Sequence, residues 1–242
     1  MTVFAADFEP FGTSHQLTLV VFFALLVPVV MIGRRVRGTD LEPTVSKGFA
    51  LLIAAIMVPF HLAEMSPGQF DLGGSLPLQL CDWAWILAIP TLWTRNRTLC
   101  AISYFWGLLL TTQALATPAL SHGFPSPEFF GFWAMHFLIV YAAIYLTWGL
   151  GIHPTWAGFR STVAVTAGWM VTVFLINLAI DTNYGFVNRK PSNPSILDYF
   201  GPWPVYLGVE ILLCAAVWAL MTWPWTRRQQ PAPRDATSQA AQ

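Results

Sequence analysis

The chain has 242 residues, of which 55% are hydrophobic and only 10% are charged, and its formal net charge is zero. A soluble domain carries about 25% charged residues, so this composition excludes an ordinary soluble protein and predicts a polytopic membrane protein. Zero net charge argues against a nucleic-acid partner. The three cysteines form neither a CxxC pair nor a zinc spacing, and no phosphate-binding glycine loop is present, so we expect no disulfide framework, no metal and no cofactor.

Seven apolar stretches are long enough to be interpreted as membrane-spanning helices, although the second and third are short. The first has no basic leader before it, so we expect a helix of the mature protein and not a signal peptide. Two helix starts are marked by local signals. Ser126 can cap a helix that begins with Pro127 and Glu128, and Pro202 with Pro204 favours a start near residue 203. The predicted spans are 13–33, 48–64, 76–93, 99–117, 127–150, 160–181 and 203–223.

We therefore predict an all-α fold, a bundle of seven transmembrane helices over residues 1–225, followed by a disordered tail over 226–242 that has too little apolar surface to fold. The basic residues orient this bundle. Only Arg189 and Lys190 fall on one side, and the positive side of a membrane protein stays in the cytoplasm. We expect an external N-terminus and a cytoplasmic C-terminus. The ten residues on the other side are Arg34, Arg35, Arg37, Lys47, Arg95, Arg97, Arg160, Arg227, Arg228 and Arg234.

With this orientation, nearly every ionisable side chain within a predicted span lies in its outer half. Such groups cost several kcal/mol in a bilayer unless they pair or line a wet cavity. The sequence therefore predicts an outward-facing polar cavity. Besides Cys81 and His136, its candidate lining or supporting residues are His15, His61, Glu64, Gln79, Asp82, Gln113, Asn177, Asp181, Asn183 and Glu210.

A structural role is the alternative for each of these residues. The spacing of His61 with Glu64, and of Asn177 with Asp181, suits pairing along one helix face. Two others, Gln113 and Glu210, suit hydrogen bonds between helices, Asp82 suits a helix N-terminus, and His15 suits the headgroup region.

Cys81 stands apart because neither other cysteine is expected near it. Cys100 begins its span on the cytoplasmic side and Cys214 lies in mid-span, so Cys81 is predicted to be a free thiol. A helix N-terminus favours a thiolate, whereas the adjacent Asp82 opposes one. At a rise of about 1.5 Å per residue, His136 lies only about 6 Å deeper, which tilt and side-chain reach can close. The alternative is a small apolar core residue.

The segment of about 182–202 is predicted to be ordered and to cover the cavity, because it carries four aromatic residues that favour burial. Arg189 and Lys190 would then lie near lipid phosphates or near Asp181. The alternative is a flexible connector. The four aromatic residues are Tyr184, Phe186, Tyr199 and Phe200.

Several segments together carry a resemblance to a known family: FGTSHQLTL, LPLQLC at 76–81, YFWGLLLTTQAL at 104–115, GFPSPEFFGFWAMHFLIV at 123–140, and NYGFVNRKPSNPSILDYFGPWPVY at 183–206. The chain resembles the bacterial YwaF-like integral membrane proteins and, more distantly, the eukaryotic transmembrane protein 164 family. The resemblance implies a multi-pass protein of a bacterial inner membrane. The eukaryotic relatives look like lipid acyltransferases that carry the acyl group on a cysteine beside a histidine, and these positions match Cys81 and His136. A still more distant group uses threonine for lipid hydrolysis.

The leading hypothesis is a lipid acyltransferase with its site facing outward. Cys81 would take a fatty acyl group from a membrane phospholipid as a thioester, and His136 would act as the base. Hydrolysis is an open variant of the same chemistry. Two alternatives come from other classes, namely a small-molecule transporter or channel that uses the outer cavity, and a receptor or assembly factor without chemistry. The sequence points to no particular protein partner.

Overall fold

The computed structural model describes residues 7–191 and 196–227, and this part of the chain is mainly helical. Its elements are α1 (Thr13–Val36), α2 (Glu42–Glu64), α3 (Leu80–Thr94), α4 (Arg97–Phe105), η1 (Trp106–Leu110), α5 (Thr111–Ala116), α6 (Pro127–Ile144), η2 (Tyr145–Gly149), α7 (Trp156–Ile180), η3 (Tyr184–Phe186), η4 (Ile196–Phe200) and α8 (Val205–Arg227). The π-helical turns η1 and η2 continue the helices before them. The all-α prediction is confirmed for these residues, whereas the predicted tail lies outside them from residue 228 on.

Six helices in the described residues are long and apolar enough to cross a membrane, in agreement with a multi-pass membrane protein. They are Thr13–Val36, Glu42–Glu64, Arg97–Ala116, Pro127–Gly149, Trp156–Ile180 and Val205–Arg227. The remaining predicted span, 76–93, is occupied by α3, which has only 15 residues. A helix of that length measures about 22 Å, against about 30 Å for a hydrocarbon layer. The structure therefore gives six helices of spanning length where the sequence predicted seven.

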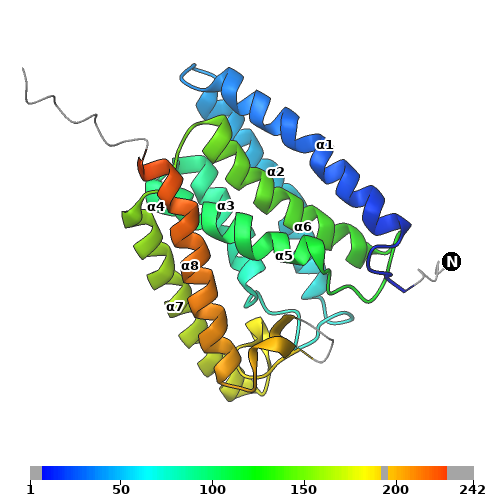
Figure 1. Cartoon of the computed structure of the whole chain (residues 1–242). Coiled ribbons are helices and arrows are strands. Elements are labelled where there is room, and N and C mark those ends of the chain that lie inside the picture. Colours follow the sequence, from blue (N-terminus) through cyan, green and yellow to red (C-terminus); the bar gives the residue numbers. More distant parts are fainter. Residues whose placement is uncertain (1–6, 192–195, 228–242) are drawn as a thin grey trace, which may run out of the picture.

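The core lies where α3, α4 and α6 meet α2. Buried side chains from these helices, among them Ile53, Leu92, Phe105 and Ile139, form one apolar cluster. About two thirds of the apolar window of Pro127–Gly149 is buried, against about a tenth for α1 and α7. Figure 1 shows α1 and α2 along one side of the bundle and α7 with α8 along the other. The outer helices thus leave their apolar surfaces exposed, as lipid contact requires.

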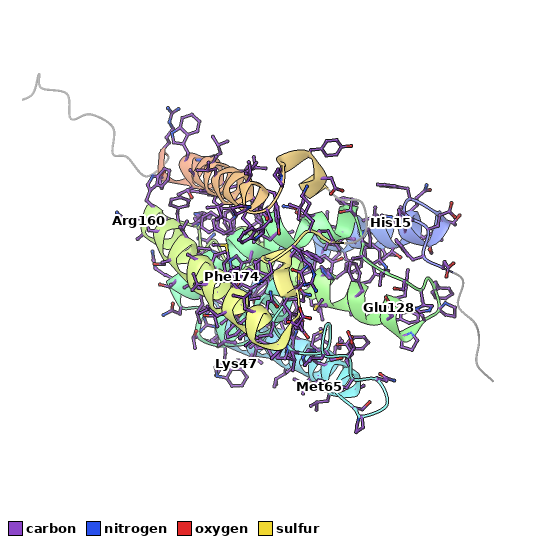
Figure 2. All side chains as sticks on the ribbon, turned by 90° about the horizontal axis from the view of Figure 1, so that it is seen from below. His15, Lys47, Met65, Glu128, Arg160 and Phe174 are labelled. Atoms are coloured by element: carbon purple, nitrogen blue, oxygen red, sulfur yellow. The ribbon has the colours of Figure 1, made fainter. Side chains whose placement is uncertain are left out.

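The two ends of the bundle differ in character. The loop end is formed by residues 65–79, 117–126 and 181–204, whose described parts lie at the same end of the bundle as the start of α1 in Figure 1. The basic end carries the described arginines and lysines other than Arg189 and Lys190, and there Arg95 pairs with the Glu42 carboxylate at 3.7 Å. Figure 2 views the molecule from below, with Arg160 toward one side and His15 with Glu128 toward the other.

Candidate functional site

The first turn of α3 is closed by a reciprocal capping box. The side-chain oxygen of Gln79 accepts the N–H of Asp82, and the Asp82 carboxylate accepts the N–H of Gln79 at 3.0 Å. Both groups satisfy N–H donors that a helix start leaves unpaired. Asp82 is buried and held by this bond. Asp82 therefore serves the helix N-terminus, and its partner is the backbone just before the helix.

Cys81 is the second residue of α3 and is half-buried against the apolar core. The hydroxyl of Thr111, the first residue of α5, lies close to its side chain. That hydroxyl donates its proton to the carbonyl of Trp106 at 3.1 Å. All three cysteines are free thiols, as predicted for Cys81.

Thr111 was not among the residues expected at this site. It begins α5 after the π-helical turn η1. Nothing in the local sequence distinguishes it from neighbouring hydroxyl residues such as Thr112, whose side chain bonds back to Leu108 of its own helix at 2.7 Å. Only the packing of the helices shows which of the two meets the cysteine.

His136 lies buried in α6, the helix that packs against both α3 and α5. Its Nδ1 is 2.6 Å from the carbonyl oxygen of Phe132, and the centroids of the His136 and Phe132 rings are 4.1 Å apart. A carbonyl can only accept, so Nδ1 carries the proton of the neutral ring and Nε2 keeps a lone pair. Within the described residues no hydrogen-bond partner occupies Nε2. This nitrogen has the form that a general base needs.

His61 and Glu64 end α2 and form the pair that their spacing predicted. His61 Nδ1 lies 3.5 Å from the Glu64 carboxylate. The centroid of the His61 ring also lies 6.1 Å from that of the Trp85 ring in α3. The second nitrogen of His61 and the indole N–H of Trp85 are both buried without a hydrogen-bond partner. The pair thus faces the helix of Cys81 and leaves polar atoms unsatisfied there.

His15 has a structural position. It is fully buried; Nδ1 accepts the N–H of Phe11 at 2.9 Å, and Nε2 lies 3.0 Å from the carbonyl of Leu115. Because both nitrogens are occupied, neither is available for proton transfer. The ring also packs against Phe8 and Trp133. His15 therefore joins the start of α1 to the end of α5.

Gln113 and Glu210 take no part in this arrangement. Gln113 is exposed on α5, and Glu210 is half-buried on α8, one turn before Cys214. Among the residues that the structure describes, neither side chain has a hydrogen bond or an ion pair.

Asn177 is the centre of a second polar cluster, at the end of α7. It is buried; its Nδ2 donates to the carbonyl of Tyr184 and to Asn188 Oδ1, and its Oδ1 accepts from the Thr182 hydroxyl and the Tyr184 N–H. Asp181 is exposed and pairs with Arg189 at 3.8 Å, as predicted. Asn177 therefore does not pair with Asp181 along the helix, because its four bonds go to the following segment.

The segment after α7 is ordered as predicted up to residue 191, while 192–195 lie outside the described residues. Asn183 exchanges two hydrogen bonds with the backbone of Arg189. Tyr184 is fully buried, but Phe186 is 37% and Tyr199 is 89% exposed. Burial of the aromatic residues thus holds for the first of the four and fails for Tyr199.

A cavity of about 320 Å³ opens beside this segment at the loop end. Its walls include Phe174 and Leu178 of α7, Trp203, the Asn177 side chain and the Asp181–Arg189 pair, and Phe174 is marked in Figure 2. In the described residues no three side chains of the His, Cys, Asp and Glu types are grouped to hold a metal ion. Of the residues predicted to line an outer cavity, Asn177 and Asp181 line this one, whereas Cys81 and His136 do not. The thiol and the neutral imidazole lie on α3 and α6, which pack against each other.

The family model of the TMEM164 family matches residues 10–222. No curated protein and no solved structure matched the chain. The matched range includes α3 with Cys81 and α6 with His136, and it covers nearly all described helices. The chain therefore belongs to the TMEM164 family.

Proposed function

We propose that this protein is a membrane-embedded acyltransferase in which Cys81 carries a fatty acyl group as a thioester. The observation that carries the proposal is the environment of the Cys81 thiol. It lies in the first turn of α3, close to Thr111, on a helix that packs against α6. There His136 is a buried imidazole with its Nε2 unprotonated.

The reaction has two balanced halves. The Cys81 sulfur attacks the ester carbonyl of a phospholipid while His136 Nε2 takes the thiol proton, and the lysolipid oxygen leaves with that proton as the carbon–oxygen bond breaks. An acceptor hydroxyl or amine then attacks the thioester and passes its proton through His136 to the departing sulfur. Water as the acceptor would make the same enzyme a hydrolase.

The helix start supplies donors for the oxyanion. The N–H of Asp82 is already taken by Gln79. The N–H groups of Leu80 and Cys81 belong to the donors that a helix cannot pair internally. They point along the helix axis, where partial positive charge favours a developing oxyanion.

Topology suggests the source of the acyl group. The basic end would face the cytoplasm and the loop end would lie outside, with α3 completing a seventh crossing of a bacterial inner membrane. Cys81 would then open to the outer leaflet, where cytosolic acyl-CoA is absent and phospholipid is abundant. Reporters fused after Ala236 and inserted near Ser192 test this orientation, because the first should read as cytoplasmic and the second as external. Both positions lie outside the described residues. The reverse pattern would reject the outer-leaflet donor.

The chemistry is tested by incubating purified protein with phospholipid labelled in its acyl chain. We expect a hydroxylamine-sensitive label on the Cys81 peptide, located by mass spectrometry. Cys81→Ser should abolish it and His136→Gln should slow its formation, whereas Cys214→Ser, a matched half-buried cysteine, should leave it unchanged. Label that survives in Cys81→Ser, or no label in the wild type with any phospholipid class, would reject the proposal.

A further inference from the structure

The chain that leads into α3 is anchored by residues about 100 positions later. We call residues 182–189 the strap. Its Tyr184 is fully buried, and the hydroxyl accepts the N–H of Leu76 at 3.0 Å and donates to the carbonyl of Leu72 at 2.7 Å. From α7, the Trp169 indole donates to the carbonyl of Leu78 at 3.1 Å. The irregular approach to the Cys81 helix is therefore fixed along its length.

Gln79 is the last link in this series. Its side-chain oxygen accepts the N–H of Asp82 in the capping box and also the N–H of Gly185 at 2.9 Å. Gly185 has a φ of +65°, and a Cβ there would collide with the ring of Trp169. The strap can approach Gln79 this closely because the residue is glycine. One amide oxygen thus joins the first turn of α3 to the strap.

The strap is a rigid support. The four hydrogen bonds of Asn177 hold its beginning. The Trp203 indole donates to the carbonyl of Val187 at 3.1 Å, and the Tyr206 hydroxyl donates to the carbonyl of Phe186. A group bonded to the strap is therefore held against the ends of both α7 and α8.

We propose that Gln79 is a positioning residue for Cys81. Through its side-chain oxygen it fixes the first turn of α3 against the strap, and so it sets the direction of the thiol two residues further on. The first turn of a helix is otherwise the part that frays. Displacing a reacting group by about 1 Å can slow a reaction by up to about 100-fold. The catalytic meaning of this inference rests on the proposed function, but the placement of the thiol does not.

The decisive variant is Gln79→Ser. Serine is a good N-cap and can keep the bond to the Asp82 N–H, but its side chain is too short to reach Gly185 as well. Two rates are measured by mass spectrometry, namely acyl-adduct formation at Cys81 in a single turnover and alkylation of Cys81 by iodoacetamide. We expect adduct formation to fall roughly 10-fold. Alkylation should accelerate severalfold because the released turn opens, while the unfolding temperature stays close to that of the wild type.

Tyr184→Phe tests the same support without altering the cap, since it removes both hydroxyl bonds to the approach segment. It should shift both rates in the same directions, and it keeps the inference testable if Gln79→Ser fails to fold. Gln113→Ala is the matched control, because this exposed glutamine has no side-chain bond within the described residues, and it should change neither rate.

The outcomes separate the two proposals. Wild-type values of both rates in Gln79→Ser and Tyr184→Phe would overturn the positioning role. Faster alkylation in these variants, with no adduct in the wild type, would sustain the positioning role and reject the acyltransferase. An equal change in Gln113→Ala would also overturn it, because the effect would then not depend on the strap.

Discussion

Gly131 of α6 faces the ring of Phe60 in α2 so closely that no side chain fits between them. A Cβ built at Gly131 would overlap the ring, with Cζ, Cε2 and Cε1 of Phe60 as its nearest atoms. Phe60 in turn packs against the main apolar cluster. In Gly131→Ala the ring must therefore leave its place, or α6 must move away from α2. Either movement disturbs the helix that carries His136.

The magnitude follows from two opposing terms. Forcing an extra methyl into a packed interior costs about 1–3 kcal/mol. Replacing glycine by alanine in a helix returns up to about 1 kcal/mol. Since the overlap involves the ring itself and no flexible side-chain end, we expect the first term to dominate. Gly131→Ala should lower the free energy of unfolding by about 1–2 kcal/mol.

The assay is equilibrium unfolding in detergent micelles, with Gly168→Ala as the matched control. A Cβ at Gly168 of α7 meets no atom within 4 Å, so that variant should be neutral or slightly stabilised. Phe60→Leu in the Gly131→Ala background should recover much of the loss, which gives a favourable coupling energy of about 1 kcal/mol or more between the two sites. Equal stability of the two alanine variants, or no recovery by Phe60→Leu, would refute the described contact.

Two further predictions concern stability at the two ends of the bundle. A Cβ at Gly33 would lie 2.6 Å from the Cα of Gly149, so Gly33→Ala should destabilise the protein by about 1–3 kcal/mol in the same unfolding assay. The control Gly48→Ala has open space around its Cβ and should not be destabilised. Similar free energies of unfolding for the two variants would contradict the close crossing of α1 and η2. Asn177→Ala removes a buried side chain with four hydrogen bonds, so we expect the free energy of unfolding to fall by about 2–4 kcal/mol and the backbone after α7 to exchange hydrogen faster. Asn183 is less buried, so Asn183→Ala should cost about 1 kcal/mol. Equal losses in the two variants would show that the buried network is not the main support.

Where the structural signal is local, the sequence predicts an element well. Ser126 caps α6 by accepting the N–H of Phe129 at 3.1 Å, and Pro127 begins the helix as predicted. The sequence predicts a span that starts at 76, yet α3 begins at Leu80. The residues between bond to Tyr184 and Trp169, which lie far along the chain. A local pattern contains no sign of such partners.

For the candidate site, too, the sequence predicts less than the structure shows. Position along a span predicts how deep a residue lies, but not which way it faces. The spanning helices are apolar nearly all round, so no polar stripe marks the side turned toward the core. His15 and Asn177 were grouped by depth, yet one joins α1 to α5 and the other holds the strap. Thr111, which lies close to Cys81, gives no signal in the sequence because hydroxyl residues commonly bond within their own helix.

The shortness of α3 gives the lipid around the protein a part in the proposed reaction. Arg95 ends the helix beside Glu42 at the basic end, and about 22 Å of helix then separates that level from the first turn. In a layer about 30 Å thick, that turn lies several Å below the level of the ester groups in the opposite leaflet. In the proposed reaction a lipid ester would reach the Cys81 sulfur by sinking beside α3 or by thinning of the bilayer there, and mismatch of this kind costs fractions of a kcal/mol per Å. In vesicles of increasing acyl-chain length, acylation of Cys81 should therefore slow even though the protein itself is unchanged.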